Sequence, residues 1–251
     1  MPEAWTGRAR MREAMANRRP DRVPAMPQIC FPHAAGLVWG DYRRGMAEMI
    51  EHPARRHEAI LEVARRYGVD GVRLFLAPGP MRVEDDGEIM TAIDPATGRR
   101  VGRVDVLGGG KVLPDQPPPL LRDRDDVKAI PQPKREALRT EAAYEDLATW
   151  TRRAQAEGFF VASSPSGFTM NFLSESRGRE QALLDLVEAP DLVEAILDAG
   201  VAAAIERAGA LVDCGIDALY IGDPSASASL ISPAHFRRYC LPRYQTFCRE
   251  L

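Results

Sequence analysis

The sequence has few cysteines, no long apolar run and no excess of positive charge, and each absence narrows the class of protein. Four cysteines are scattered over 251 residues without a Cys-x-x-Cys pair. The first residues contain no apolar signal segment, and no apolar run approaches the ~18 residues needed to span a bilayer. We therefore expect a cytoplasmic protein with reduced thiols and no membrane contact.

The charge balance argues against a nucleic-acid partner. Thirty-three basic and 36 acidic residues give a net charge of -3, so a basic footprint over the whole domain is absent. The N-terminus is locally basic, and we interpret its arginines as a solvated helix face: Arg8, Arg10, Arg12, Arg18, Arg19 and Arg22.

Strand-like and helical patterns alternate along the chain. Helical spacing of apolar residues extends from Pro53 to Gly68, over Arg139–Gln155, and from Pro190 to Gly215. Ser232 and Pro233 fit the start of a last helix, which Pro242 must kink or break. Strands are predicted between these patterns, at Val23–Cys30, Val72–Leu76, 158–168 and 217–222. Such alternation predicts an α/β fold with a parallel sheet covered by helices.

Residues 79–113 have a different pattern. Short β-prone runs are separated by the turn dipeptides Asp86-Gly87 and Thr97-Gly98. This arrangement predicts inserted antiparallel β-hairpins. A proline-rich connector follows, and we expect it to be extended.

The number of βα units falls short of a closed barrel. About four to five units can be counted, whereas a (β/α)8 barrel needs eight. One explanation is a single domain, 1–251, that forms the N-terminal part of a TIM barrel and is incomplete at its C-terminus. The other is an open fold whose free sheet edge another chain covers, for example in a homodimer. We favour the first explanation.

Asp223 is the predicted catalytic residue. It ends the apolar run of "DALYIGD" and precedes a loop of small residues. Active sites of α/β enzymes lie at the carboxyl ends of parallel strands. The alternative is that Asp223 caps its own loop through hydrogen bonds to Ser225 or Ala226.

Substrate-binding residues are predicted in three loops that follow strands. His33 follows the first strand and is either a pocket residue or an ordinary loop histidine. The serines after the third strand leave room for a ligand and can bond to it, whereas Met170 and Phe172 form either a pocket wall or core packing. The predicted set is His33, Ser163, Ser164, Met170, Phe172 and Ser225.

Three stretches carry a resemblance to a known family. "RRPDRVPAMP", "GVDGVRLF" and "GIDALYIGDPSASASLISPAHFRRYCLPRY" resemble the uroporphyrinogen decarboxylase superfamily. The resemblance implies a (β/α)8 barrel. It also implies one of two activities: decarboxylation in haem biosynthesis, or zinc-dependent methyl transfer between corrinoid proteins and thiols such as coenzyme M.

The methyltransferase branch fits the residues better. The decarboxylases bind substrate carboxylates through arginines in the first loop, which is suitable chemistry for that task. Here that loop reads "CFPHAAGLVWGDY" and has no arginine before Arg43. "LFLAPGP" lacks the acid that follows the second strand in the decarboxylases, and Phe172 stands where they have a tyrosine.

The resemblance also implies cofactors and partners. The methyltransferases hold zinc through a His-x-Cys pair and a further cysteine, a pattern that His235, Cys240 and Cys248 do not match. We therefore expect the zinc ligands outside this chain and no metal ligand within it. A corrinoid protein is the expected methyl donor and a small molecule the expected substrate. Uroporphyrinogen decarboxylation and a non-catalytic half-barrel binding module remain as alternatives.

Overall fold

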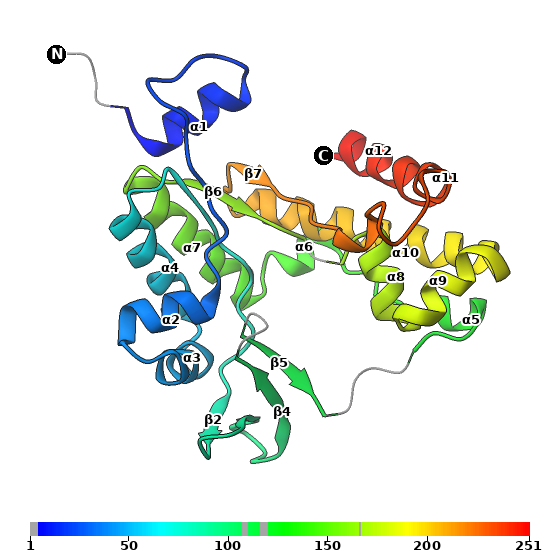
Figure 1. The fold of residues 1–251 in the computed structure, drawn as a ribbon, viewed down its shortest axis with the longest axis horizontal. Helices are drawn as coiled ribbons and strands as arrows, with labels where there is room; N and C mark the ends of the chain where they lie inside the picture. Colours follow the sequence, from blue (N-terminus) through cyan, green and yellow to red (C-terminus); the bar gives the residue numbers. More distant parts are fainter. Residues whose placement is uncertain (1–4, 107–109, 116–119, 166) are drawn as a thin grey trace. The chain divides into compact units, whose positions relative to one another are not determined.

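A computed structural model describes residues 5–106, 110–115, 120–165 and 167–251 (Figure 1). The chain divides into two compact units. The first comprises Met1–Pro117, Ala142–Ser163 and Cys214–Ala218, and the second comprises Pro118–Glu141, Ser164–Asp213 and Leu219–Leu251. Residues 107–109 of the predicted hairpin region lie outside the described residues.

A three-stranded sheet contains β1 (Gly71–Arg73), β6 (Phe160–Ser163) and β7 (Ala218–Leu219), in the order β1-β6-β7. β1 and β6 are parallel, with Gly71 opposite Phe160 and Arg73 opposite Ala162. All four residues of β6 are buried, as expected for a central parallel strand with both faces covered. The predicted α/β class with a parallel sheet is therefore confirmed.

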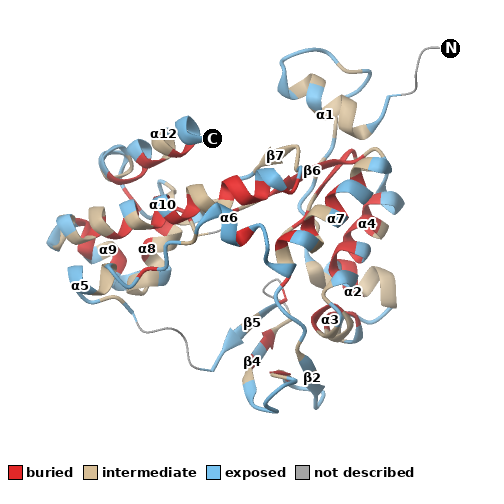
Figure 2. Ribbon diagram, turned by 180° about the vertical axis from the view of Figure 1, so that it is seen from behind, coloured by how far each residue is buried: buried red, intermediate tan, exposed pale blue. Residues whose placement is uncertain are grey.

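Amphipathic helices accompany this sheet. Helices α4 (Ala54–Tyr67) and α7 (Ala142–Ala156) each have buried residues at helical spacing, and Figure 2 shows these residues in red. Gly68 ends α4 in the left-handed conformation, as predicted, because glycine adopts positive φ without a Cβ clash. Helices α2 (Phe31–Trp39) and α3 (Tyr42–Glu51) pack against each other and against α4.

The prediction of a strand over Val23–Cys30 is wrong. This segment belongs to no assigned strand, because Pro24 and Pro27 cannot donate the hydrogen bonds that a ladder requires. It nevertheless runs beside β1, where the backbone N–H of Asp70 donates to the carbonyl of Ala25 at 2.8 Å.

The interpretation of the N-terminal arginines as a solvated face is also wrong for four of them. In helix α1 (Gly7–Met15), Arg8 and Arg12 bond to Asp217 at 2.8 and 2.7 Å, although the Asp217 side chain is only 1% exposed. Asp217 immediately precedes β7. Helix α1 is thereby attached to the start of that strand.

Asp70, which immediately precedes β1, has an equivalent pair of arginines. Arg10 and Arg22 bond to its buried carboxylate at 3.1 and 2.7 Å. The two acids therefore gather arginines at the amino ends of two parallel strands, a role that spacing along the sequence does not reveal.

The first unit also contains an antiparallel four-stranded sheet (Figure 1). Its strands, in spatial as well as chain order, are β2 (Arg82–Asp85), β3 (Met90–Ile93), β4 (Arg100–Asp105) and β5 (Lys111–Pro114). Gly87 and Gly98 have φ values of 94° and 68°, and they lie in the turns between β2 and β3 and between β3 and β4.

The second unit is mainly helical. It contains α5 (Arg124–Val127), α6 (Arg135–Leu138), α8 (Thr169–Arg177), α9 (Arg179–Glu188), α10 (Pro190–Asp213), α11 (Pro233–His235) and α12 (Leu241–Glu250). A 3-10 turn at Pro224–Ala226 and a π-helical turn at Phe236–Cys240 complete it. Helix α10 starts at Pro190, as predicted. Pro242 lies in the first turn of α12, after the π-helical turn, so the predicted interruption is confirmed.

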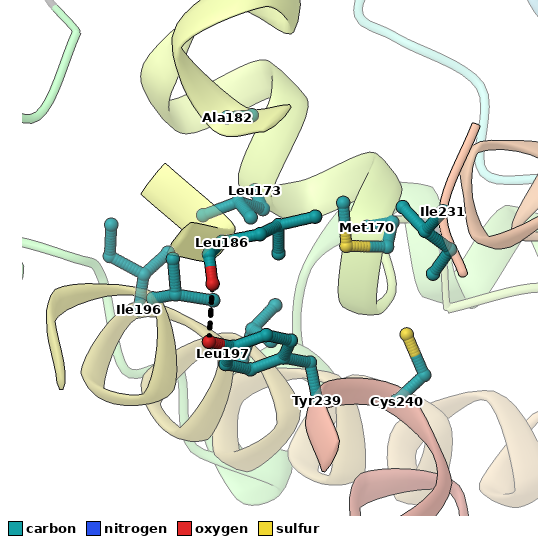
Figure 3. Close-up of a cluster of buried hydrophobic side chains, with 10 residues drawn as sticks. Met170, Leu173, Ala182, Leu186, Ile196, Leu197, Ile231, Tyr239 and Cys240 are labelled. Carbon is teal, nitrogen blue, oxygen red and sulfur yellow. Dashed lines mark hydrogen bonds between the residues drawn. The ribbon is translucent and has the colours of Figure 1, made fainter. Parts of the chain in front are cut away.

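The core of this unit lies between α8, α9, α10 and the π-helical turn. Figure 3 shows its buried side chains around Tyr239, whose hydroxyl donates to the carbonyl of Leu186 at 2.8 Å. The buried members are Met170, Leu173, Ala182, Leu186, Val193, Ile196, Leu197, Ile231, Tyr239 and Cys240.

Among the helices of the described residues, none combines the length and the apolar character that a membrane span requires.

Candidate functional site

The Asp223 carboxylate lies at the N-terminus of α8. Its Oδ2 accepts the backbone N–H of Met170 at 3.0 Å, and its Oδ1 accepts that of Asn171 at 3.0 Å. Phe168, the N-cap residue of α8, provides no side-chain hydrogen bond. Asp223 therefore satisfies free N–H groups of a helix that begins 54 residues earlier, and the helix dipole favours its negative charge.

Thr169 adds a third donor from a strained position. Its hydroxyl donates to Asp223 Oδ2, and its φ is 31°. Positive φ is unfavourable for a β-branched residue, and such strain persists only where the surroundings enforce it. Since the hydroxyl bond ends on Asp223, we attribute the strained geometry to this contact.

The side chain of Asn171 connects α8 to the loop that carries Asp223. Its Nδ2 donates to the carbonyl of Gly222 at 3.1 Å, and its Oδ1 accepts the backbone N–H of Ser225 at 3.3 Å. The residues on both sides of the acid are thus fixed to the same helix. The loop of small residues is ordered by these bonds, because it has few side chains of its own to pack.

Tyr244 of α12 provides the fourth donor, with its hydroxyl 3.4 Å from Asp223 Oδ2. Its ring makes an edge contact with Phe168, with centroids 4.9 Å apart. Burial raises the pKa of the Tyr244 hydroxyl well above its usual range, with the charge of Asp223 adding to the effect. Burial likewise raises the pKa of the nearby Cys240 thiol to about 11, so this thiol is protonated at neutral pH.

Asp223 itself is desolvated. Burial raises the pKa of its carboxyl above the ordinary value, although hydrogen bonds from Thr169, Asn171, Met170 and Tyr244 favour the charged form. Oδ2 accepts three of the four bonds and Oδ1 accepts one. A carboxylate oxygen accepts about two hydrogen bonds, so Oδ1 retains the capacity to accept an N–H or O–H of a ligand.

A hollow of about 250 Å³ borders the same loop. Phe236 and Ile231 give it apolar walls, and the exposed Arg237 provides a positive charge at its edge. The remaining lining residues are Ala226, Ala228, Ser232 and Pro233. Their small size leaves the space open.

Four of the predicted site residues lie in this unit with Asp223. Ser225 belongs to the 3-10 turn and bonds to Asn171. Met170 is fully buried in the apolar cluster of Figure 3. Phe172 is half-buried beside Gly200 of α10, where a Cβ would come within 2.4 Å of its ring. Ser164 follows β6 and is half-buried. Their ligand contacts stay predictions.

The two other predicted residues belong to the first unit. His33 is exposed on α2, and its Nε2 lies 2.9 Å from the hydroxyl of Tyr67, whose ring it stacks on. Ser163 ends β6 with 1% exposure, and its Oγ has no hydrogen-bond partner among the described residues. Ser163 thus offers a free polar group at a carboxyl strand end.

Sequence reasoning missed Thr169, Asn171 and Tyr244. No local pattern marks them, because each acts on an acid that is distant in the chain. For Tyr244 the one available signal was its place in "LPRY", the end of a stretch that supported the family resemblance.

The described residues do not fit a zinc site. They contain no cluster of three His, Cys, Asp or Glu side chains that could hold a metal ion. Cys240 is buried and Cys248 is exposed, and neither belongs to such a cluster. No chemical step is therefore assigned to zinc here.

Comparison with known proteins identifies the family. The family described as uroporphyrinogen decarboxylase (URO-D) matches residues 90–251, which is more than half of the chain. The chain belongs to the uroporphyrinogen decarboxylase family, and the resemblance seen in the sequence is confirmed.

Methyltransferases are among the proteins that this chain resembles. Over 61 residues, the chain is 43% identical to the methylcobamide:CoM methyltransferase MtaA of Methanosarcina barkeri and 41% identical to that of M. barkeri strain Fusaro / DSM 804. Each match covers 24% of this chain and 18% of the relative. A solved methyltransferase from Methanosarcina mazei superposes with a TM-score of 0.59 and 18% identity, over 98% of this chain and 67% of that one. This last likeness establishes the fold.

Proposed function

We propose that this protein is a corrinoid-linked methyltransferase that transfers a methyl group from a corrinoid protein to a small-molecule thiol. The observation that carries the proposal is the 43% identity to a methylcobamide:CoM methyltransferase. The first loop supports it, since the loop lacks the arginines that a substrate with many carboxylates would need.

We further propose that the three parallel strands belong to a (β/α)8 barrel, of which this chain supplies about the first four to five βα units. The superposition on 67% of a solved methyltransferase supports this proposal. In such a barrel the loops after the strands face the active site, and the loops after β6 and β7 contain Ser164 and Asp223.

Asp223 is the proposed catalytic acid of this site. Four donors hold its desolvated carboxylate, and Oδ1 can accept one further hydrogen bond. This oxygen accepts an N–H or O–H of the substrate and thereby orients the substrate. Ser225 and the hollow beside it bind the body of the substrate. Zinc dependence stays a prediction, and its ligands would come from outside the described residues.

A direct assay tests this function. The full-length protein is incubated with methylcobalamin or a methylated corrinoid protein and a panel of small thiols, and the methyl thioether is measured by mass spectrometry. We expect a thioether product that depends on the protein and decreases strongly in Asp223→Asn. If no thiol is methylated with either donor, the proposal is wrong.

The alternative is the decarboxylation of a uroporphyrinogen-like substrate, favoured by the name of the matching family. Incubation with uroporphyrinogen, followed by chromatography of the products, distinguishes decarboxylation from methyl transfer. Products with fewer carboxyl groups would support decarboxylation, whereas unchanged uroporphyrinogen together with a methylated thiol would support methyl transfer.

A further inference from the structure

Arg56 is a buried cation with no ion-pair partner in the part of the chain that the structure describes. The residue is 8% exposed, and its Nε has no hydrogen-bond partner among the described residues. Its neighbour Arg55 is exposed and pairs with Glu48. Burial of an unpaired charge is costly. We therefore expect Arg56 to have a partner that belongs to a bound ligand.

The nearest described contact of Arg56 is aromatic. Its Cζ lies 4.5 Å from the centroid of the Phe31 ring. A cation–π contact offsets part of the desolvation but gives the buried Nε–H no acceptor. Desolvation lowers the pKa of Arg56 to about 10, so the guanidinium is still charged at neutral pH.

Arg56 lies at the carboxyl end of the parallel sheet. The adjacent His57 places its Nε2 2.9 Å from the carbonyl of Phe75, two residues beyond β1. Helix α4 therefore brings its first turn, with Arg56, to the end of β1 at which α/β proteins bind their ligands.

The N-terminus of α2 lies at the same place. Phe31, which Arg56 contacts, is the first residue of α2, and the N-cap residue Cys30 provides no side-chain hydrogen bond. An uncapped helix start attracts anions through its free N–H groups and its dipole; in α2 these N–H groups belong to Phe31 and His33, because Pro32 between them has none. The buried guanidinium thus packs on the side chain of the residue that begins an uncapped helix.

We propose that Arg56 and the N-terminus of α2 bind the oxyanion group of a small ligand, namely a carboxylate, sulfonate or phosphate. Arginine binds such groups through two parallel hydrogen bonds. The buried free Oγ of Ser163, at the carboxyl end of the neighbouring strand β6, offers a further donor at this end of the sheet. The proposal does not depend on methyl transfer.

Anion binding by the full chain tests the inference. Sulfate, phosphate and acetate are titrated at constant ionic strength, with chloride as the balancing ion, and binding is followed by calorimetry and by the thermal midpoint. We expect at least one of the three anions to raise the midpoint of the wild type. Arg56→Met should weaken that anion at least ~10-fold, since the bidentate partner is lost.

Arg55→Met is the matched control, because it removes a neighbouring exposed arginine of the same helix and should bind the anion as the wild type does. In chloride alone, Arg56→Met should be at least as stable as the wild type, because it removes an unpaired buried charge. Arg56→Lys, which keeps the charge without the planar fork, should bind with intermediate affinity.

Two results would overturn the proposal. One is a wild type whose stability responds to none of the three anions. The other is an anion response that Arg56→Met and Arg56→Lys retain in full. The anion that binds most tightly indicates whether the oxyanion group of the ligand is a sulfonate, a phosphate or a carboxylate. Since binding is the readout, an inactive methyl-transfer assay would leave the result unaffected.

Discussion

Asp223 takes the place of an N-cap for α8, with its Oδ1 accepting the backbone N–H of Asn171 at 3.0 Å. The two residues are 52 positions apart. This bond and the return bonds of the Asn171 side chain join the loop after β7 to α8. The same carboxylate therefore contributes to stability and to the candidate site.

Replacement of Asp223 should affect both properties. Asp223→Ala leaves two backbone N–H groups without acceptors, and we expect a loss of about 1–2 kcal/mol in the free energy of unfolding, measured with urea. Asp41→Ala is the matched control, because Asp41 caps α3 through the N–H groups of Arg43 and Arg44. Both variants should lose similar stability, but only Asp223→Ala should lose methyl transfer. Equal activity in the two variants would contradict the role of Asp223.

Two substitutions of Thr169 distinguish the effect of its side-chain shape from the effect of its hydroxyl. Thr169→Val keeps the shape of the side chain but removes the hydroxyl that donates to Asp223. We expect a cost of about 1 kcal/mol and a further rise in the pKa of Asp223, observed by carboxyl NMR titration. Thr169→Ser keeps the donor and should preserve that pKa. An unchanged pKa in Thr169→Val would show that the hydroxyl does not stabilise the carboxylate.

The stability of the first unit should depend on pH through Asp217. Burial alone would raise the pKa of Asp217, but bonds from Val161, Arg8, Arg12 and Gln155 lower it below the ordinary value. Its contribution is therefore fully present above about pH 4, the unfolded value, and is lost as the pH falls through the lower folded pKa.

Asp217→Asn should accordingly cost about 2 kcal/mol at pH 7, since Arg8 and Arg12 lose their carboxylate acceptor. The difference from wild type should shrink below pH 4, as measured by urea unfolding over a pH series. Asp125→Asn, at an exposed pair with Lys128, should change stability little at any pH. A pH-independent difference for Asp217→Asn would exclude the charge effect.

Two tyrosines of the second unit should respond differently to loss of the hydroxyl. Tyr239→Phe leaves the buried carbonyl of Leu186 without its donor (Figure 3), and we expect a loss of about 1–2 kcal/mol. Tyr244→Phe removes only a long bond of 3.4 Å to Asp223 and should cost less. Its effect should instead be a higher pKa of Asp223, detected in the same carboxyl titration. A larger stability loss for Tyr244→Phe than for Tyr239→Phe would contradict the view that the Tyr239 hydroxyl makes the stronger bond.

Features set by neighbouring residues could be predicted from the sequence. Gly68 ends α4 because only glycine adopts its φ freely, and Ser232 caps the last helical segment by accepting the N–H of His235 at 3.1 Å. Helix α10 starts at Pro190, as its apolar spacing indicates. These signals lie within one or two helical turns, and tertiary contacts do not override them.

Features that depend on distant residues could not be predicted. The donors to Asp223 come from Thr169, Met170, Asn171 and Tyr244, and nothing near Asp223 in the chain indicates which helix start it meets. The pairing of arginines with Asp70 and Asp217 likewise depends on the packed sheet.

The attachment of α1 to Asp217 has a consequence for the order of folding. Arg8 and Asp217 are 209 residues apart, so α1 cannot make this contact during synthesis until almost the whole described chain has left the ribosome. Such a long-range contact closes late and slows folding. Until then Arg8 and Arg12 lack the Asp217 carboxylate, and the nascent sheet depends on its local helices for protection from aggregation.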